Sequence, residues 1–334
     1  MFIIQNYFVA VLFCIITMLC WGSWANTQKL ASKEWRFELF YWDYTIGILL
    51  TALLLAFTLG SIGTEGRPFL EDVTQGSSAN IWSALIGGGV FNIANILLIA
   101  AISIAGMSVA FPVGIGIALI LGVLNNYMND PIGNPLVLFG GVGFVAIAIL
   151  VNAKAYRKLT VATQKVSTKG LALSVISGCL MGLFYGYVAN SMSKNFTIPE
   201  VGYLTPYTAL VFFSIGIFFS NFVLNTIIMR WPFEGKPVAF SNYLHGSARS
   251  HFMGILGGII WCVGMSFSII ASGKAGPAIS YGLGQGATIV AAIWGIYIWK
   301  EFKNAPAGTG KLLKAMLLLY LVGLALIIIS RTID

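Results

Sequence analysis

Long apolar runs separated by short polar stretches dominate the chain. Each run is close to the roughly 20 apolar residues that a helix needs to cross a hydrocarbon core of about 30 Å. None alternates apolar and polar positions as barrel strands do, and lipid does not tolerate unpaired backbone groups. We therefore predict an all-α integral membrane protein whose first run is the first span and not a removed signal. Ten transmembrane helices are expected near residues 5–27, 38–60, 80–103, 107–127, 135–153, 170–192, 203–228, 252–273, 275–299 and 311–330.

Composition agrees with this pattern. Of 334 residues, 58% are hydrophobic and only 9% are charged, whereas soluble domains carry about 25% charged residues. The net charge of +8 does not indicate a nucleic-acid partner, because the basic residues gather in the predicted loops. The four cysteines, Cys14, Cys20, Cys179 and Cys262, lie inside apolar runs without metal-ligand spacing. We expect free thiols, no metal and no cofactor.

The distribution of basic residues predicts the orientation in the membrane. Loops after the odd-numbered spans hold 15 of the 19 Lys and Arg residues, and only Arg67, Lys194, Lys274 and Arg331 lie on the other side. The positive-inside rule then places the odd loops in the cytoplasm and both termini outside. The basic stretch 154–169 is expected to be a cytoplasmic linker, with binding of anionic lipid as a weaker alternative.

The two halves of the chain resemble each other at an offset of about 170 residues. Leu85–Gly88 corresponds to Ile255–Gly258, and Ala105–Gly106 corresponds to Ala275–Gly276. An odd number of helices per repeat inverts the second copy, and inverted repeats are typical of secondary transporters with a midplane site. We therefore predict a first five-helix repeat in 1–153, a linker in 154–169 and a second five-helix repeat in 170–334.

Asp43 is the one acidic residue that the predicted spans place within the membrane. An ionised carboxylate there costs up to about 3 kcal/mol, which indicates a proton-coupling or gating group. The alternative is an interfacial side chain that reaches water or pairs with Lys29 or Lys33. His245 and His251 lie in a loop, and we assign them no chemistry.

Uncharged polar and aromatic side chains recur at helical spacing within the spans. Tyr281, Gln285 and Thr288 follow i, i+4, i+7 and should share one face. Amides and aromatic rings together suit a neutral, hydrogen-bonding solute, although interhelical hydrogen bonds and interfacial aromatic belts would also explain them. The candidate substrate-binding residues are Trp21, Trp24, Asn26, Asn92, Asn95, Tyr187, Asn190, Trp261, Tyr281, Gln285 and Thr288.

Three classes of function remain to be compared. An enzyme would need a catalytic constellation such as paired intramembrane carboxylates, which the sequence does not offer. A receptor or assembly subunit would carry an extramembranous domain, yet the longest loop has about twenty residues. A transporter fits best, with a metabolite facilitator or exporter as a variant of the same class. Pro112 in the fourth span is expected to kink its helix.

Several segments of the sequence resemble those of the ureide permease family, which belongs to the drug/metabolite transporter superfamily. They are WGSWANTQK, YWDYT, AFPVGIGIALILGVLNNYM, LTPYTALVFFSIGIFFSNFVLNTIIMRWPFEGKP and, most specifically, AISYGLGQGATIVAAIWGIYIWKEFKN. The GIGIALILG region also resembles bacterial sugar porters of that superfamily. The residues carried over from these segments are Trp21, Asn26, Asp43, Trp294 and Glu301, although Glu301 is better explained by an ion pair with Lys300 or Lys303.

The resemblance implies ten helices in inverted repeats and import of a small neutral solute, with a proton as the candidate coupling ion. Plant members carry a long central loop, whereas this chain has a short one, so it looks like a bacterial relative located in the inner membrane. The substrate is expected to be a sugar, a nucleoside or a ureide-like solute, and a bacterial relative would take a sugar or nucleoside and not a ureide.

Overall fold

The computed structural model describes residues 1–31, 35–159, 167–233 and 235–333, and in that part of the chain ten helical spans are long and apolar enough to cross a membrane. This confirms the predicted all-α membrane fold, with each predicted span within a few residues of an observed one. The helices are α1 (Tyr7–Ser23), α2 (Asn26–Leu30), α3 (Phe37–Phe57), α4 (Phe69–Gln75), α5 (Ser78–Ala105), α6 (Met107–Asn129), α7 (Pro135–Arg157), α8 (Thr168–Ser191), α9 (Pro206–Arg230), α10 (Phe240–Leu244), α11 (Ala248–Ala275), α12 (Pro277–Gly284), α13 (Ala287–Ile293), the π-helical turn η1 (Trp294–Ile298) and α14 (Thr309–Ile329).

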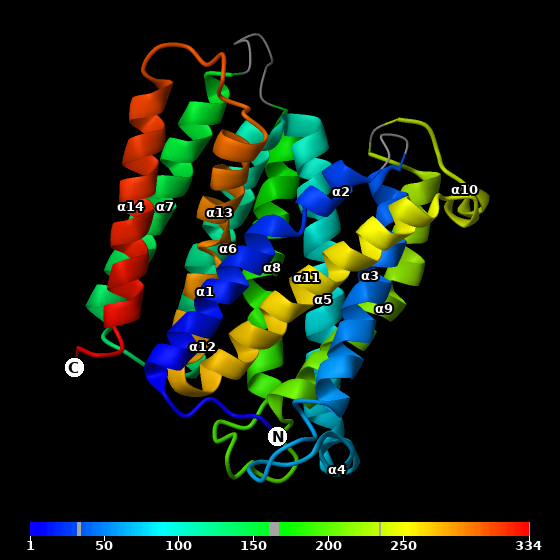
Figure 1. The fold of residues 1–334 in the computed structure, drawn as a ribbon, viewed down its shortest axis with the longest axis vertical. Coiled ribbons are helices and arrows are strands. Elements are labelled where there is room, and N and C mark those ends of the chain that lie inside the picture. The colour runs from blue at the N-terminus through cyan, green and yellow to red at the C-terminus, as the bar shows by residue number, and fades with distance from the viewer. Residues whose placement is uncertain (32–34, 160–166, 234, 334) are drawn as a thin grey trace.

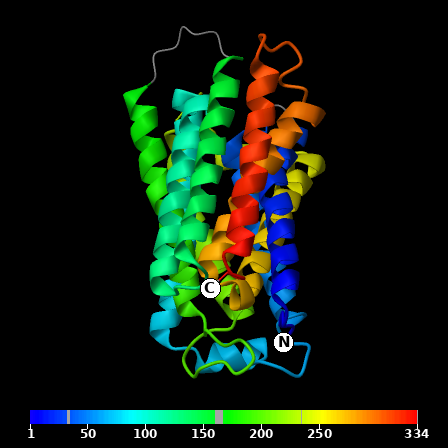
Figure 2. The same cartoon turned by 90° about the vertical axis from the view of Figure 1, so that its left-hand side faces the viewer.

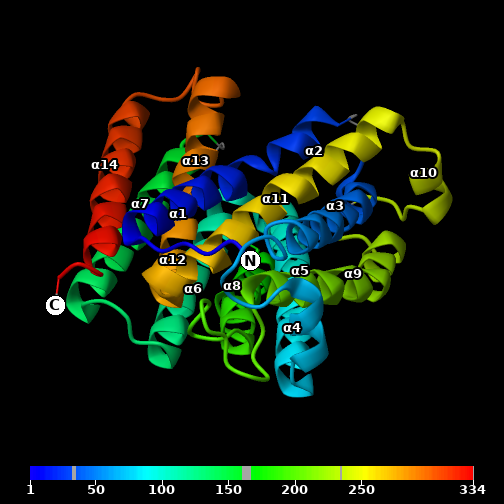
Figure 3. The ribbon, with the colours of Figure 1, turned by 60° about the horizontal axis from the view of Figure 1, so that its bottom comes forward.

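The spans form one bundle in which both chain ends lie at the same end (Figures 1 and 2). The C-terminus of α7, the N-terminus of α8 and the short helices α2 and α10 lie at the opposite end, which we call the basic end because the predicted odd loops gather there. Helices α7 and α14 pack together on one flank, and α1 crosses beside α11 (Figure 3). Of the basic-loop residues, Lys33 and Lys165 lie outside the described residues, as does the central part, 160–166, of the 154–169 linker.

Local sequence signals account for where these helices begin. Ser77, Ser167 and Ser247 cap α5, α8 and α11, and each side chain accepts a hydrogen bond from a backbone N–H of the first turn. Such caps satisfy donors that would otherwise be unpaired at the helix start. Proline occupies the first position of α7, α9 and α12, where its missing N–H costs nothing.

Two glycine contacts bring helices together in matching ways. A methyl group added at Gly88 of α5 would overlap the Phe213 carbonyl of α9, and one added at Gly258 of α11 would overlap the Tyr44 carbonyl of α3. The two glycines are 170 residues apart (258 − 88), and the two carbonyls are 169 apart (213 − 44). Small residues at these positions let the helix backbones approach closely.

The connections from α5 to α6 and from α11 to α12 have the same backbone geometry. Gly106 has φ 79° and ψ 153°, and Gly276 has φ 84° and ψ 149°. Only glycine adopts such angles readily, so each span can turn directly into the next. These glycines are also 170 residues apart (276 − 106).

The ninth span is interrupted, contrary to the single helix expected. Helix α12 ends at Gly284, α13 begins at Ala287, and the chain then widens into the π-helical turn η1. Tyr281 therefore does not share a continuous helical face with Gln285 and Thr288. By contrast, α6 continues through Pro112 as one uninterrupted helix.

Candidate solute-binding cavity

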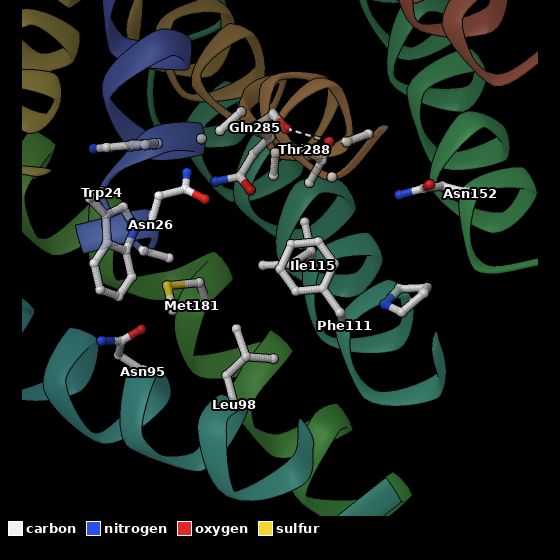
Figure 4. Close-up of a pocket in the computed structure, with 18 of the residues that line it drawn as sticks. Trp24, Asn26, Asn95, Leu98, Phe111, Ile115, Asn152, Met181, Gln285 and Thr288 are labelled. Atoms are coloured by element: carbon white, nitrogen blue, oxygen red, sulfur yellow. Dashed lines mark hydrogen bonds between the residues drawn. The ribbon is translucent and has the colours of Figure 1, made fainter. Parts of the chain in front are cut away.

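A cavity of about 250 Å³ lies among α1, α2, α5, α6, α7, α8, α11 and α13 (Figure 4). Its volume is slightly below the roughly 300–1,000 Å³ of pockets that hold drug-sized ligands, so it suits a smaller molecule. Seven of the predicted substrate-binding residues line it, and they come from both halves of the chain. They are Trp21, Trp24, Asn26, Asn95, Trp261, Gln285 and Thr288.

Aromatic side chains form the deep walls of the cavity. The Trp21 and Trp261 rings are stacked with centroids 5.9 Å apart and an interplanar angle of 13°. The centroid of the Phe91 ring lies 4.5 Å from that of Trp261 and 5.1 Å from that of Phe184. Flat rings of this kind offer large apolar contact to a planar or apolar solute face.

Three amide side chains in the lining have hydrogen-bonding groups without a protein partner among the described contacts. Gln285 is 7% exposed and its side chain makes no described hydrogen bond, and the Oδ1 atom of Asn152 is buried without a partner. Asn95 uses only its Nδ2 atom, which donates to the Tyr41 hydroxyl at 3.1 Å. Buried polar groups are normally paired, so these open positions favour a ligand or water in the cavity.

Asn152 was not among the sequence candidates. It lies near the C-terminus of α7, in the segment VNAKAYR. An amide next to basic residues is typical of a helix end. No periodic polar stripe marks it, because Ala148 and Ile149, one turn earlier on α7, are apolar. The inward direction of its side chain depends on how α7 packs.

Two other polar lining residues already have partners. Asn26 donates to the Ser23 carbonyl at 3.0 Å and accepts from Trp299 Nε1 at 2.6 Å. Thr288 donates to the Gln285 carbonyl at 3.1 Å and accepts from the Tyr320 hydroxyl at 2.6 Å. These residues therefore hold the cavity wall in shape.

The cavity lining extends to a partly exposed ion pair at the basic end. Lys29 Nζ lies 3.1 Å from Glu301 Oε1, with 49% and 30% of the two side chains exposed. Tyr156 donates to Glu301 Oε2 at 2.8 Å, and Lys29 lies 4.9 Å above the Trp299 ring. Because these residues line the cavity and reach solvent, the cavity opens at the basic end.

The ion pair at the mouth corrects the partners expected for Glu301 and for Asp43. Glu301 pairs with Lys29 and not with Lys300 or Lys303. Lys29 is consequently not the partner of Asp43, and Lys33 lies outside the described residues. Trp294, also carried over from the family segments, donates to Ser23 Oγ at 2.9 Å and ties η1 to the end of α1.

Four of the predicted substrate-binding residues do not line the cavity. Tyr187 is 39% exposed, and Asn190 is exposed as well. Tyr281 is buried beneath the cavity, 5.2 Å from the Tyr185 ring, at the end away from the mouth. Asn92 is buried behind the wall, where it accepts a hydrogen bond from the Tyr41 hydroxyl at 2.8 Å.

Asp43 lies outside the cavity in a separate cluster. Its side chain is 3% exposed, its two carboxylate oxygens each lie 3.0 Å from His251 Nδ1, and Tyr243 donates to Oδ1 at 2.7 Å. We call Asp43, Tyr243 and His251 the Asp43 cluster. The Trp35 ring covers it, 4.9 Å from the His251 ring.

The two partners of Asp43 differ in their surroundings. Burial, and then the hydrogen bond to Asp43, raise the pKa of Tyr243 above its usual value, so Tyr243 remains a hydrogen-bond donor at neutral pH. The His251 side chain is 26% exposed and so connects the buried carboxylate to solvent. No local pattern pointed to His251, because 208 residues (251 − 43) separate it from Asp43 along the chain.

A ten-span helical bundle with a polar cavity that opens at one end is typical of a membrane transporter. The family model described as ureide permease matches residues 40–165 and 150–330. The chain therefore belongs to the ureide permease family, and it is a multi-pass transporter and not an enzyme.

Individual proteins are similar to this chain over much of its length. Ureide permease 1 of Arabidopsis thaliana is 25% identical and the alignment covers 99% of each chain. The probable glucose uptake protein GlcU of Staphylococcus aureus is 25% identical over 68% of this chain and 71% of its own. One crystal structure shares the fold, with a TM-score of 0.59, 15% identity and coverage of 97% of this chain and 98% of that one.

Proposed function

We propose that this transporter imports a small neutral polar solute by alternating access, driven by a proton. The observation that carries the proposal is the set of open amide positions on Gln285, Asn95 and Asn152 between aromatic walls. Among the lining residues that the structure describes, only Lys29 and Glu301, which pair at the mouth, are charged. A charged solute would enter the deep part of the cavity without a counter-charge, which is costly.

The chemistry of the lining favours a ureide as the solute. A ureide is planar and carries alternating N–H and C=O groups, which complement amide side chains while its faces stack on Trp and Phe rings. The relatives named as ureide permeases support this choice. A sugar is the second candidate, because another relative is named as a glucose uptake protein; nucleosides have the same mixture of flat and polar surfaces.

The proposed mechanism uses the two predicted halves, 1–153 and 170–334, as inverted repeats. The matched glycine contacts of Gly88 and Gly258 and the matched connections at Gly106 and Gly276 support it. In such transporters, one half moves against the other around a central site and exposes it to each side in turn. The cavity mouth would close when the segment after η1 moves across it.

We place the protein in the bacterial inner membrane with both termini outside. Since the basic end then faces the cytoplasm, the structure corresponds to a state that is open inward. A topology reporter fused after Asp334 should be active only outside the cytoplasm. Activity of the fusion in the cytoplasm would contradict this orientation.

Asp43 is the proposed proton-binding group. It is buried within a span, and His251 gives it a route to the basic end. Its neighbours in sequence reach the cavity wall: Tyr44 packs on Trp24 at 4.7 Å, and Tyr41 holds Asn95. A change of charge at Asp43 can therefore shift α3 and alter the cavity.

Ligand-dependent thermal stability of the purified protein tests the proposal first. We expect stabilisation by hydantoin, the simplest cyclic ureide, or by glucose, and none by charged analogues such as hydantoic acid. Labelled uptake into proteoliposomes should follow the same order and rise when the outside is more acidic. A protein that binds none of the sugars, nucleosides or ureides would contradict the proposed function.

A further inference from the structure

The amide of Asn95 is held by a chain of hydrogen bonds that runs from the cavity wall back to α9. Asn95 Nδ2 lies 3.1 Å from the Tyr41 hydroxyl, which lies 2.8 Å from Asn92 Oδ1. Asn92 Nδ2 in turn lies 2.8 Å from Ser220 Oγ. Tyr41, Asn92 and Asn95 are at most 5% exposed, so water cannot easily replace these partners.

The end of this hydrogen-bond chain at α9 determines which group donates and which accepts in each hydrogen bond. The Ile217 carbonyl can only accept, and it receives hydrogen bonds from Ser220 Oγ at 3.0 Å and from Asn92 Nδ2 at 3.3 Å. Because the single proton of Ser220 is thus used, its oxygen accepts from the NH₂ group of Asn92. The Asn92 oxygen therefore faces Tyr41 and accepts the tyrosine proton.

Tyr41 has then used its only proton, so it can only accept from Asn95. The NH₂ group of Asn95 consequently points away from the cavity and its oxygen points toward it; Figure 4 shows this oxygen on the side of Met181 and Leu98. A neutral amide that could turn would offer either a donor or an acceptor. Here Tyr41 leaves only the acceptor.

We infer that Tyr41 determines part of the specificity of the cavity, which rests on the proposed function because the solute must bind there. It is a positioning residue behind the wall that fixes Asn95 as a hydrogen-bond acceptor. The solute must therefore present an N–H or O–H donor to this side of the cavity. Gln285 has no side-chain partner and adapts to either kind of group, so the discrimination comes from Asn95.

Tyr44 provides a matched control on the same helix. Its ring lies 5.3 Å from that of Tyr41 and 4.7 Å from that of Trp24, and it is equally buried. Its hydroxyl has no hydrogen-bond partner among the residues that the structure describes. Removing the Tyr44 hydroxyl therefore changes the packing of α3 about as much as removing the Tyr41 hydroxyl does, but it leaves the hydrogen bonds that hold Asn95 unchanged.

The experiment measures how well four compounds compete for labelled hydantoin on purified wild-type protein, Tyr41→Phe and Tyr44→Phe. The compounds are hydantoin, its 1-methyl and 3-methyl derivatives, and succinimide, in which CH₂ replaces one ring N–H without added bulk. In the wild type, loss of the N–H that faces Asn95 should weaken binding about tenfold or more, because the acceptor is left buried and unpaired.

In Tyr41→Phe the Asn95 amide is no longer held, so its oxygen can turn away from a ligand that lacks this N–H. We therefore expect the preference to fall to about threefold or less, while Tyr44→Phe keeps it. Asn95→Leu is a second variant and should also lose the preference. A preference that persists in Tyr41→Phe or in Asn95→Leu would overturn the inference. Absence of binding by the wild type would instead contradict the proposed function on which it rests.

Discussion

The cavity and the Asp43 cluster are two polar regions of the bundle interior, and they are built in opposite ways. The deep cavity holds uncharged amides, of which Gln285 and Asn152 have open hydrogen-bonding positions. In the Asp43 cluster the groups are titratable, and both carboxylate oxygens already have partners. A ligand can complete the first region, whereas only a change in protonation can alter the second.

Helix α3 connects these two regions. Asp43 faces α11, where Gly254 leaves room for its side chain, while Tyr41 and Tyr44 face the cavity wall. Close contact between Gly258 and the Tyr44 carbonyl leaves α3 and α11 little freedom to move separately. We therefore expect solute binding and proton binding to be separable by mutation but linked through this helix pair.

Gln285→Leu should have the largest effect, because it removes the amide with the most open positions from the cavity. We expect binding of hydantoin or glucose to weaken at least about tenfold and uptake to be lost. The protein should still fold, since side-chain volume is kept. Asn190→Leu, the same change on an exposed residue outside the lining, should leave ligand-dependent thermal stability unchanged.

Gly295→Ala should reduce uptake severalfold by disturbing the mouth. A methyl group at this position would lie 2.7 Å from the Tyr156 hydroxyl and 2.8 Å from Glu301 Oε2. It would push apart the contacts that connect α7, η1 and α2, while the deep cavity stays intact. Uptake should fall more than equilibrium binding, and Gly310→Ala, where a methyl group meets no neighbour within 4 Å, is the control. Equal loss of binding and uptake would contradict a role confined to the mouth.

Tyr243→Phe should have the smallest effect. Because the pKa of Tyr243 is raised by burial and by Asp43, its hydroxyl stays protonated between pH 5 and 8 and contributes only one hydrogen bond, worth about 1 kcal/mol or slightly more. We expect accumulation to change about threefold. Complete loss of accumulation at every pH would contradict this small role for Tyr243.

The sequence predicted the spans well because burial in lipid imposes long apolar runs whatever the tertiary packing. Seven of its eleven candidate substrate-binding residues line the cavity, among them Trp21, Asn95 and Gln285, but most of the other lining residues carried no signal in the sequence. It missed the break after Gly284, because YGLGQGA has ordinary helix-packing glycines and no proline at the break. Side-chain partners such as His251 for Asp43 and Lys29 for Glu301 depend on contacts between distant helices, which local patterns do not encode.

The separation of solute binding from proton coupling is tested most directly with Asp43→Asn in proteoliposomes, where accumulation driven by a pH gradient and solute exchange are measured on the same vesicles. Asp130→Asn is the control, because Asp130 forms only a partly exposed pair with Lys194 at 3.7 Å. The amide keeps the size of the carboxylate but cannot titrate. We predict that Asp43→Asn loses accumulation while exchange stays within about threefold of the wild type. Asp43→Asn protein that still concentrates solute under a pH gradient would contradict the assignment of Asp43 as the proton-binding group.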